Sequence, residues 1–336
     1  MSPVGPGPWL APLAPLYGAA VLLRRWSYDR GLAASVRPAV TTIAVGGLEA
    51  GGSGKTPVTG LVLRALLAAG RRPGLLTRGY GRRTTALAVR LPGGPASPEE
   101  LGDEPAMLVA SGLDVAVAAC GRRSAGAAAL VGRVDTLVLD DGFQHRALAR
   151  DLDIVVLRGE APFGTGHLLP WGTLREPPSS LARAGVVWLH FRGEPQLEPP
   201  VWLARLAPRA DLVISVAEPE GDLDAVRGAR VVAAAGIARP ADLAEALSAL
   251  GAEVAALRAL RDHHAFDTAD ARALADLVQG ANAAALVVTP KDAIKLVPHW
   301  SAPPPLWVVG TRPRIVRGAE ALAARLGLPL STVAGA

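Results

Sequence analysis

The chain has 336 residues, of which half are hydrophobic and 19% are charged. This composition excludes a disordered or fibrous protein and predicts a globular chain of about two domains. A single cysteine, Cys120, excludes an internal disulfide and a cysteine-rich zinc site. It also favours a reducing compartment.

Arginine carries almost all of the positive charge. The net charge is +5, and the lysines among the 35 Lys and Arg residues are Lys55, Lys291 and Lys295. Two interpretations are open: a compositional bias toward arginine on a solvated surface, or attraction to an anionic partner. The aromatic residues do not alternate with arginine as on RNA-stacking surfaces, so we expect no nucleic-acid partner. Because arginine serves elsewhere in the chain, each remaining lysine is a candidate functional residue.

The N-terminal segment is apolar but short. Residues 8–23 carry no charge, contain Pro12 and Pro15, and fall short of the roughly 20 residues that span a bilayer. Arginines follow this run rather than precede it, which is the reverse of a secretory signal. The segment is either a helix packed on its own domain or an interfacial membrane helix over residues 1–28. Aromatic residues along it favour the second interpretation: Trp9, Tyr17 and Trp26.

Residues 29–212 alternate between β-branched apolar runs and runs of helical periodicity. Strands are predicted within residues 39–48, 71–83, 113–119, 134–145, 152–157, 184–191 and 210–216. This alternation predicts an α/β fold with a doubly wound, mostly parallel sheet. Two long loops rich in glycine and proline exceed the usual loop length, so we expect them to be mobile or functional: 77–105 and 159–180.

A second, smaller α/β domain is expected over residues 213–336. Its predicted elements are strand, loop, helix and strand in 229–257, a helix at 268–280, strands at 284–290 and 305–311, and a final helix at about 318–326.

A glycine-rich loop lies between the first predicted strand and the helix that follows it. Its residues are Gly51, Gly52, Ser53, Gly54, Lys55 and Thr56. The N–H groups of such a loop and the adjacent helix N-terminus bind phosphate oxygens, so Lys55 is expected to reach the β- and γ-phosphates and Thr56 to bind Mg²⁺. The first position of the strict P-loop motif is Glu49 here instead of glycine, so the loop is a variant.

Acidic residues supply the other candidate chemistry. Asp140 and Asp141 end the strand predicted within 134–145, where a P-loop enzyme places the acid that binds the metal. A kinase also needs a base near the acceptor hydroxyl, and the acidic pair Asp103–Glu104 and the run Asp262-His263-His264 are candidates for it. Each of these could instead be a helix cap or part of a surface loop.

Several short motifs follow one another along the chain at 51–57, 78–81, 102–105, 140–145, 168–170, 174–177, 262–263 and 291–296. In this order the set resembles the tetraacyldisaccharide 4′-kinase family, over roughly residues 45–296. The chain departs from the family pattern at Pro290, where an acidic residue is usual.

The resemblance implies a P-loop NTPase-like fold and an ATP-dependent lipid kinase. The kinase would use ATP and Mg²⁺ to phosphorylate the 4′-hydroxyl of a tetraacylated glucosamine disaccharide 1-phosphate, giving lipid IVA. It would act at the cytoplasmic face of the bacterial inner membrane, with residues 1–28 on the lipid surface, and no obligate protein partner is indicated. The resemblance assigns residues 29–212 to the P-loop kinase domain.

The resemblance also assigns roles to individual residues. It implies that Asp103 is the base, paired with His263. The metal ligands it implies are Thr56, Asp140 and Asp141, and its further contacts to the nucleotide or acceptor are Tyr80, Gln144, His145, Arg175 and Glu176. A phosphate contact falls on either Arg122 or Arg123, and the sequence leaves this choice open.

Two other classes of protein compete with the kinase. A nucleotide-switch or metallochaperone GTPase would show an N-K-x-D motif or a Cys/His-rich metal run, and the sequence contains neither. In a non-enzymatic, membrane-associated structural protein, a phosphate loop combined with a separate pair of aspartates would be unexpected.

Overall fold

The computed structural model describes residues 8–301 and 303–336. The predicted interfacial helix 1–28 can therefore be compared only from residue 8 onward, because residues 1–7 and the side chain of Trp9 lie outside the described part. The strands are β1 (Thr41–Gly46), β2 (Pro73–Thr77), β3 (Ala88–Arg90), β4 (Ala116–Ala119), β5 (Thr136–Asp140), β6 (Leu152–Arg158), β7 (Val186–Phe191), β8 (Asp211–Gly221), β9 (Arg230–Ala235), β10 (Glu253–Ala259), β11 (Ala285–Val288) and β12 (Leu306–Arg317). The α-helices are α1 (Ala14–Asp29), α2 (Lys55–Ala68), α3 (Pro98–Leu101), α4 (Asp103–Ala110), α5 (Arg123–Leu130), α6 (Val201–Leu206), α7 (Leu223–Val226), α8 (Ala241–Ala249), α9 (Thr268–Gly280), α10 (Pro290–Leu296), α11 (Ala319–Leu326) and α12 (Leu330–Ala334). The 3₁₀ helices are η1 (Pro8–Leu13), η2 (Pro178–Arg183) and η3 (Val297–His299).

The described strands form one sheet in the order β10-β9-β11-β12-β8-β7-β6-β1-β5-β2-β4-β3. Neighbouring strands run parallel except in the pairs β12–β8 and β3–β4. The doubly wound, mostly parallel α/β sheet predicted from the sequence is confirmed.

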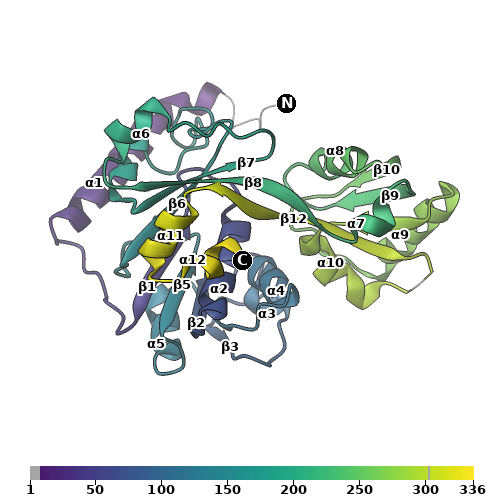
Figure 1. Cartoon of the computed structure of the whole chain (residues 1–336), viewed down its shortest axis with the longest axis horizontal. Coiled ribbons are helices and arrows are strands. Elements are labelled where there is room, and N and C mark those ends of the chain that lie inside the picture. Colours follow the sequence, from purple (N-terminus) through teal and green to yellow (C-terminus); the bar gives the residue numbers. More distant parts are fainter. Residues whose placement is uncertain (1–7, 302) are drawn as a thin grey trace.

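The sheet carries two bodies, joined by the long antiparallel pair β8 and β12 (Figure 1). The larger body surrounds β1 to β7, and the smaller one surrounds β9 to β11. The domain boundary expected between residues 212 and 213 falls inside β8, because this strand continues from the larger body into the connection.

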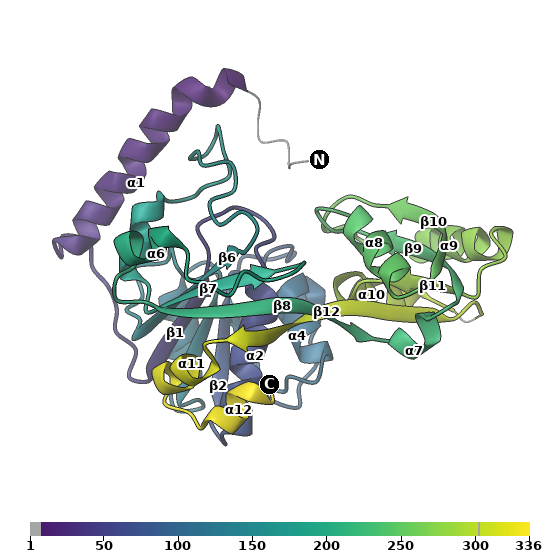
Figure 2. The ribbon, with the colours of Figure 1, turned by 45° about the horizontal axis from the view of Figure 1, so that its top comes forward.

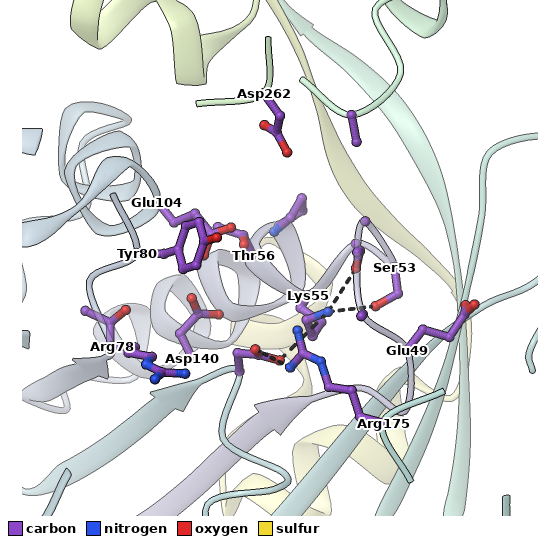
Figure 3. A pocket seen from close by; sticks show the side chains of 18 of the residues that line it. Glu49, Ser53, Lys55, Thr56, Arg78, Tyr80, Glu104, Asp140, Arg175 and Asp262 are labelled. Carbon is purple, nitrogen blue, oxygen red and sulfur yellow. Dashed lines mark hydrogen bonds and ion pairs between the residues drawn. The ribbon is translucent and has the colours of Figure 1, made fainter. Parts of the chain in front are cut away.

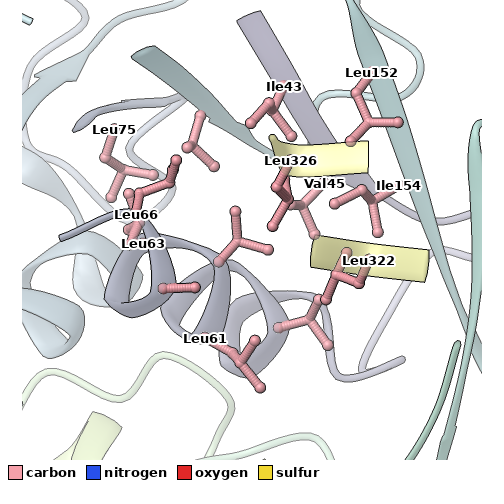
Figure 4. Packing of buried hydrophobic residues seen from close by; sticks show 14 of the residues in the cluster. Ile43, Val45, Leu61, Leu63, Leu66, Leu75, Leu152, Ile154, Leu322 and Leu326 are labelled. Atoms are coloured by element: carbon pink, nitrogen blue, oxygen red, sulfur yellow. The ribbon is translucent and has the colours of Figure 1, made fainter. Parts of the chain in front are cut away.

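The C-terminal helices pack on the larger body, which differs from the expected single unit at 213–336. Leu322 of α11 and Val333 of α12 belong to the same buried cluster as Ile43 of β1 and Leu61 of α2 (Figure 4). Burial of one such leucine contributes about 1.5–3 kcal/mol to the free energy of folding. This gain favours packing of the apolar faces of α11 and α12 against the larger body. The smaller body is therefore the region between β8 and β12, without α11 and α12.

The β1–α2 unit positions the phosphate loop. Strand β1 is buried from its second residue onward, as expected for a central strand covered on both faces. Helix α2 is buried around most of its circumference, because it packs on the sheet and shares one buried cluster with residues of α4, α11 and α12. The loop between β1 and α2 is thus anchored at both ends in the core.

Helix α1 lies along the outside of the larger body (Figure 2). One side is attached by polar contacts: the Tyr17 hydroxyl donates to the carbonyl of Arg175 (3.0 Å), and Arg24 donates to the carbonyl of Gln144 (3.0 Å). Another side presents Leu16 and Leu23, which are 69% and 65% exposed. Within the described ranges, no helix is both long and apolar enough to cross a bilayer.

Candidate active site

A cleft of about 1190 Å³ lies at the carboxyl ends of the central strands, where open α/β sheets bind their ligands. Every residue that the sequence assigned to the nucleotide or the metal lines this cleft, except Glu176. The smaller body contributes Asp262 (Figure 3) and also His263 and Lys291 to the same cleft. Residues far apart in the sequence are thus brought to one place.

The phosphate loop wraps around the amine of Lys55. Its Nζ donates to the carbonyl of Gly51 (3.1 Å) and to Ser53 Oγ (3.4 Å) (Figure 3). Lys55 is the first residue of α2, and Gly54 before it has φ +82°, a left-handed conformation that favours glycine. The lysine and the N-terminus of α2 therefore present positive charge at the same point of the cleft.

Neighbouring segments fix the shape of this loop. Gln144 donates its side-chain N–H to the carbonyl of Gly47 (3.0 Å), and the N–H of Arg175 donates to the carbonyl of Leu48 (2.7 Å). On the far side, a Cβ added to Gly54 would lie 2.5 Å from Cδ2 of His190. Three motifs that are separate in the sequence thus form one hydrogen-bonded unit.

Asp140 ends β5 and is buried, as expected for an acid at a central strand end. Its Oδ1 accepts a hydrogen bond from Thr59 Oγ1 of α2 at 3.0 Å. Burial, and then the charge of Asp141, raise the pKa of Asp140. Glu104 of α4 hydrogen-bonds Asp140, and burial together with this partner raises the pKa of Glu104 to about 8.

Asp141 lies between two cations. Arg175 Nη1 lies 2.5 Å from its Oδ2, and Lys55 Nζ lies 3.8 Å from its Oδ1. Burial opposes ionisation, but the positive charges of Lys55 and Arg175 outweigh it, so the pKa of Asp141 lies below its ordinary value. The backbone of Asp141 has φ +49°, which is uncommon for a residue with a side chain and is found most often at functional positions.

The structure brings Asp103 and His263 together although 160 positions separate them. Asp103 begins α4 in the larger body, and its Oδ2 lies 2.9 Å from Nδ1 of His263 in the smaller body. Lys295 of α10 donates to the same Oδ2 at 3.2 Å. Asp103 is buried, and His263 connects it to the cleft, which it lines.

Aromatic and basic side chains complete the lining. The ring of Tyr80 is largely exposed, and its centroid lies 4.9 Å from that of His263. Burial and the nearby arginines lower the pKa of His145 to about 4, so this ring is neutral near pH 7. Of the two arginines left open by the sequence, Arg123 lines the cleft and Arg122 does not.

Glu176 lies outside the cleft. Its buried carboxylate pairs with Arg183 at 2.9 Å, and it lines a small neighbouring recess beside Tyr17 of α1. The residue before it, Arg175, does line the cleft. In this structure Glu176 thus holds the 174–177 segment against η2 and does not face the main cavity.

The sequence analysis gave no specific role to four residues in and around this site: Glu104, His190, Lys291 and Lys295. The scarcity of lysine was a usable signal for two of them, and Glu104 was visible as half of an acidic pair. His190 carries no signal, because it belongs to β7 and meets Gly54 only through the packing of the sheet.

A phosphate loop, two acids at the end of the adjacent strand and a histidine that lines the same cleft and contacts a buried acid define a kinase of the P-loop class. The family model described as tetraacyldisaccharide-1-P 4′-kinase matches residues 7–327, so the chain belongs to that family. The family resemblance and the kinase activity class expected from the sequence motifs are thereby confirmed.

Known proteins agree with this assignment. The chain is 44% identical over 330 residues to a tetraacyldisaccharide 4′-kinase of Anaeromyxobacter dehalogenans strain 2CP-C, covering 92% of this chain and 87% of that one. It is 43% identical over 334 residues to the protein of the same name in strain 2CP-1, with 94% and 88% covered. The crystal structure of the "apo" form of LpxK from Aquifex aeolicus in complex with ATP superposes with a TM-score of 0.75. That match has 25% identity and covers 95% of this chain and 97% of that one.

Proposed function

We propose that this chain transfers the γ-phosphoryl group of ATP to the 4′-hydroxyl of a tetraacylated glucosamine disaccharide 1-phosphate. Membership of the family, the names of the relatives and the ATP complex of the structural neighbour support this reaction. The observation that carries the proposal is that the phosphate loop and His263 line one cleft, and that His263 contacts the buried Asp103 at 2.9 Å.

In the proposed reaction Asp103 is the base. The acceptor hydroxyl gives its proton to the carboxylate while its oxygen forms a bond to the γ-phosphorus. The bond between that phosphorus and the oxygen bridging to the β-phosphate breaks, and ADP leaves. Lys55 and the loop N–H groups balance the negative charge that develops on the phosphates.

The residues at the end of β5 fit a magnesium ion. Mg²⁺ prefers oxygen ligands, and Thr56, Asp140 and Asp141 offer a hydroxyl and two carboxylates at one side of the cleft. Among the described residues, the buried Oδ1 of Asp141 accepts no hydrogen bond, which leaves it available as a ligand. We propose these three residues as the metal ligands; the bound ion would offset charge on the phosphate oxygens.

We further propose that the exposed apolar face of α1 rests on the cytoplasmic face of the bacterial inner membrane. Leu16, Leu23 and Trp26 follow one another at helical spacing and are each about half exposed or more. An acceptor with four acyl chains is held in a bilayer, so a kinase for its sugar must work beside the lipid surface. Arg24 on the same helix lines the cleft, which connects the lipid-facing element to the site.

Transfer of ³²P from γ-labelled ATP to the tetraacyl disaccharide 1-phosphate in detergent micelles tests the proposed function. We expect labelled bisphosphate lipid from the wild type, and a rate lower by about 10²–10⁴-fold for Asp103→Asn. Asp276→Asn is the matched control, because Asp276 is an exposed carboxylate on α9 away from the cleft. Its rate should equal that of the wild type.

Three results would count against the proposal. Absence of labelled lipid with the wild type would refute the reaction. Lys55-dependent hydrolysis of ATP or GTP without labelled lipid would favour a nucleotide-switch protein. Full activity of Asp103→Asn would remove Asp103 from the chemistry while leaving the reaction in place.

A further inference from the structure

Two of the lysines of this chain, Lys55 and Lys291, line the cleft, and Lys295 contacts Asp103 beside it. Of the 35 Lys and Arg residues in the sequence, the lysines are Lys55, Lys291 and Lys295, and all the others are arginines. Lys55 lies in the phosphate loop, while Lys291 and Lys295 lie four residues apart on α10. That spacing puts both amines on one face of the helix, and α10 packs against α4, which begins with Asp103.

Lys295 and His263 both donate to the same oxygen of Asp103. Lys295 Nζ lies 3.2 Å from Oδ2, and His263 Nδ1 lies 2.9 Å from Oδ2. In the described part of the chain, no hydrogen bond reaches Oδ1. Gly81 faces this second oxygen, since a Cβ placed there would lie 3.6 Å from Oδ1. In the described ranges, one oxygen of the carboxylate thus has two donors and the other has no hydrogen-bond partner.

Lys291 acts on the other side of the histidine ring. Its Nζ donates to Asp262 Oδ1 (2.7 Å) and lies 3.3 Å from Nε2 of His263. An ammonium group has only donors, so Nε2 must be the acceptor in this contact. The ring proton of the neutral imidazole then sits on Nδ1, which is the atom that donates to Asp103.

Both positions favour lysine over arginine. The side chains of Lys295 and Asp103 are only 9% and 8% exposed, and Lys295 Nζ also lies 5.9 Å from the centroid of the Phe266 ring. A compact ammonium fits between a carboxylate and an aromatic ring, whereas a planar guanidinium is larger and prefers to bind both carboxylate oxygens. Arginine at 295 would therefore compete for Oδ1.

We propose that Lys291 and Lys295 are positioning residues for the phosphoryl transfer. Lys295 saturates Oδ2 of Asp103, so that Oδ1 is the atom that takes the proton of the acceptor hydroxyl. Lys291 holds His263 as the tautomer that carries its proton on Nδ1. This inference rests on the proposed function and adds to it two residues that do not themselves touch the reacting atoms.

Steady-state kinetics on the full chain provide the first test. Lys295→Met keeps the length of the side chain and removes its charge, and we expect kcat to fall by about 10–100-fold while KM for both substrates changes by less than about threefold. Lys295→Arg restores the charge but should recover less than about a tenth of kcat, because its fork also engages Oδ1. Arg325→Met is the control: it breaks the Arg325–Asp211 pair (2.6 Å) on α11 and should leave kcat unchanged.

A double variant separates positioning from a structural role. Because Lys295 acts through Asp103, the variant Asp103→Asn/Lys295→Met should be no slower than Asp103→Asn alone. A further loss of rate in the double variant, or full activity of Lys295→Arg, would overturn the role of Lys295. Failure of the wild type to phosphorylate the lipid would refute the proposed function instead, so the two outcomes are distinguishable.

Nitrogen NMR on ¹⁵N-histidine-labelled protein tests Lys291 without any measurement of activity. The ring signals of His263 are those that disappear in His263→Asn. We expect the wild type to show the Nδ1-protonated tautomer and Lys291→Met to show a mixture of the two neutral tautomers. An unchanged tautomer in Lys291→Met would overturn the assignment of Lys291.

Discussion

Glu104 on α4 hydrogen-bonds Asp140 at the end of β5, so two carboxyl groups from different elements share a proton at the edge of the cleft. Burial, followed by the charge of Asp140 and this hydrogen bond, raises the pKa of Glu104 to about 8. Near pH 7, Glu104 therefore remains protonated in the folded protein, whereas the same glutamate in the unfolded chain is ionised.

This proton makes the stability of the ligand-free protein depend on pH. Between the ordinary pKa of glutamate and about 8, the folded state binds more protons than the unfolded state, so the free energy of unfolding should fall as the pH rises from about 5 to about 8. Glu104→Gln removes the titrating group and should flatten this dependence. Urea unfolding across that range measures it, with the exposed Glu100→Gln as control. An equally steep dependence in Glu104→Gln would show that the proton is held elsewhere.

Removal of the amine in the phosphate loop should abolish most of the activity. Lys55→Ala deletes the cation that lies against the Gly51 carbonyl and Asp141, and the transfer rate should fall by about 10²–10³-fold. Arg71→Ala, just beyond the C-terminal end of α2, removes a half-exposed charge and should have no effect. ATP turnover in the same micelle assay checks both variants. Retention of turnover by Lys55→Ala would mean that the phosphate loop is misassigned.

The apolar face of α1 can be tested without disturbing its contacts to the body. Leu16→Gln/Leu23→Gln should weaken binding to vesicles of phosphatidylethanolamine and phosphatidylglycerol by at least about tenfold, because each buried leucine contributes about 1.5–3 kcal/mol. Activity on the lipid in detergent micelles should persist, since Tyr17 and Arg24 remain attached. Leu197→Gln changes an equally apolar residue, 49% exposed, on another surface and serves as control. Undiminished binding of the double variant to vesicles would place the membrane contact elsewhere.

Substitutions that disturb the packing of α11 on the larger body should lower the free energy of unfolding. Leu322 is fully buried in the cluster with α2 and β1, so Leu322→Ala should lower the free energy of unfolding by about 2–5 kcal/mol. Leu330→Ala, at a 42% exposed position on α12, should cost far less. Denaturant midpoints at constant slope measure both variants. Equal losses would contradict the packing seen in Figure 4.

The local motifs could be predicted from the sequence because each one is a continuous segment, and its own residues determine its backbone conformation. The glycines of 51–54 and the charged pair at 140–141 predicted the phosphate loop and its acids, and both line the cleft. The sheet was readable for the same reason, since β-branched runs alternate with helical periodicity. The family assignment followed from the order of these segments and is confirmed.

The sequence by itself thus determined the fold class, the phosphate loop and the family. Only the tertiary structure decided that α11 and α12 complete the core of the larger body, that Glu104 shares a proton with Asp140, and that Lys295 meets Asp103 across 192 positions. The physical reason is that such contacts depend on the order of strands in the sheet and on how two bodies pack through β8 and β12. Local preferences of the chain specify each element, whereas the burial of their apolar faces against one another selects which side chains meet.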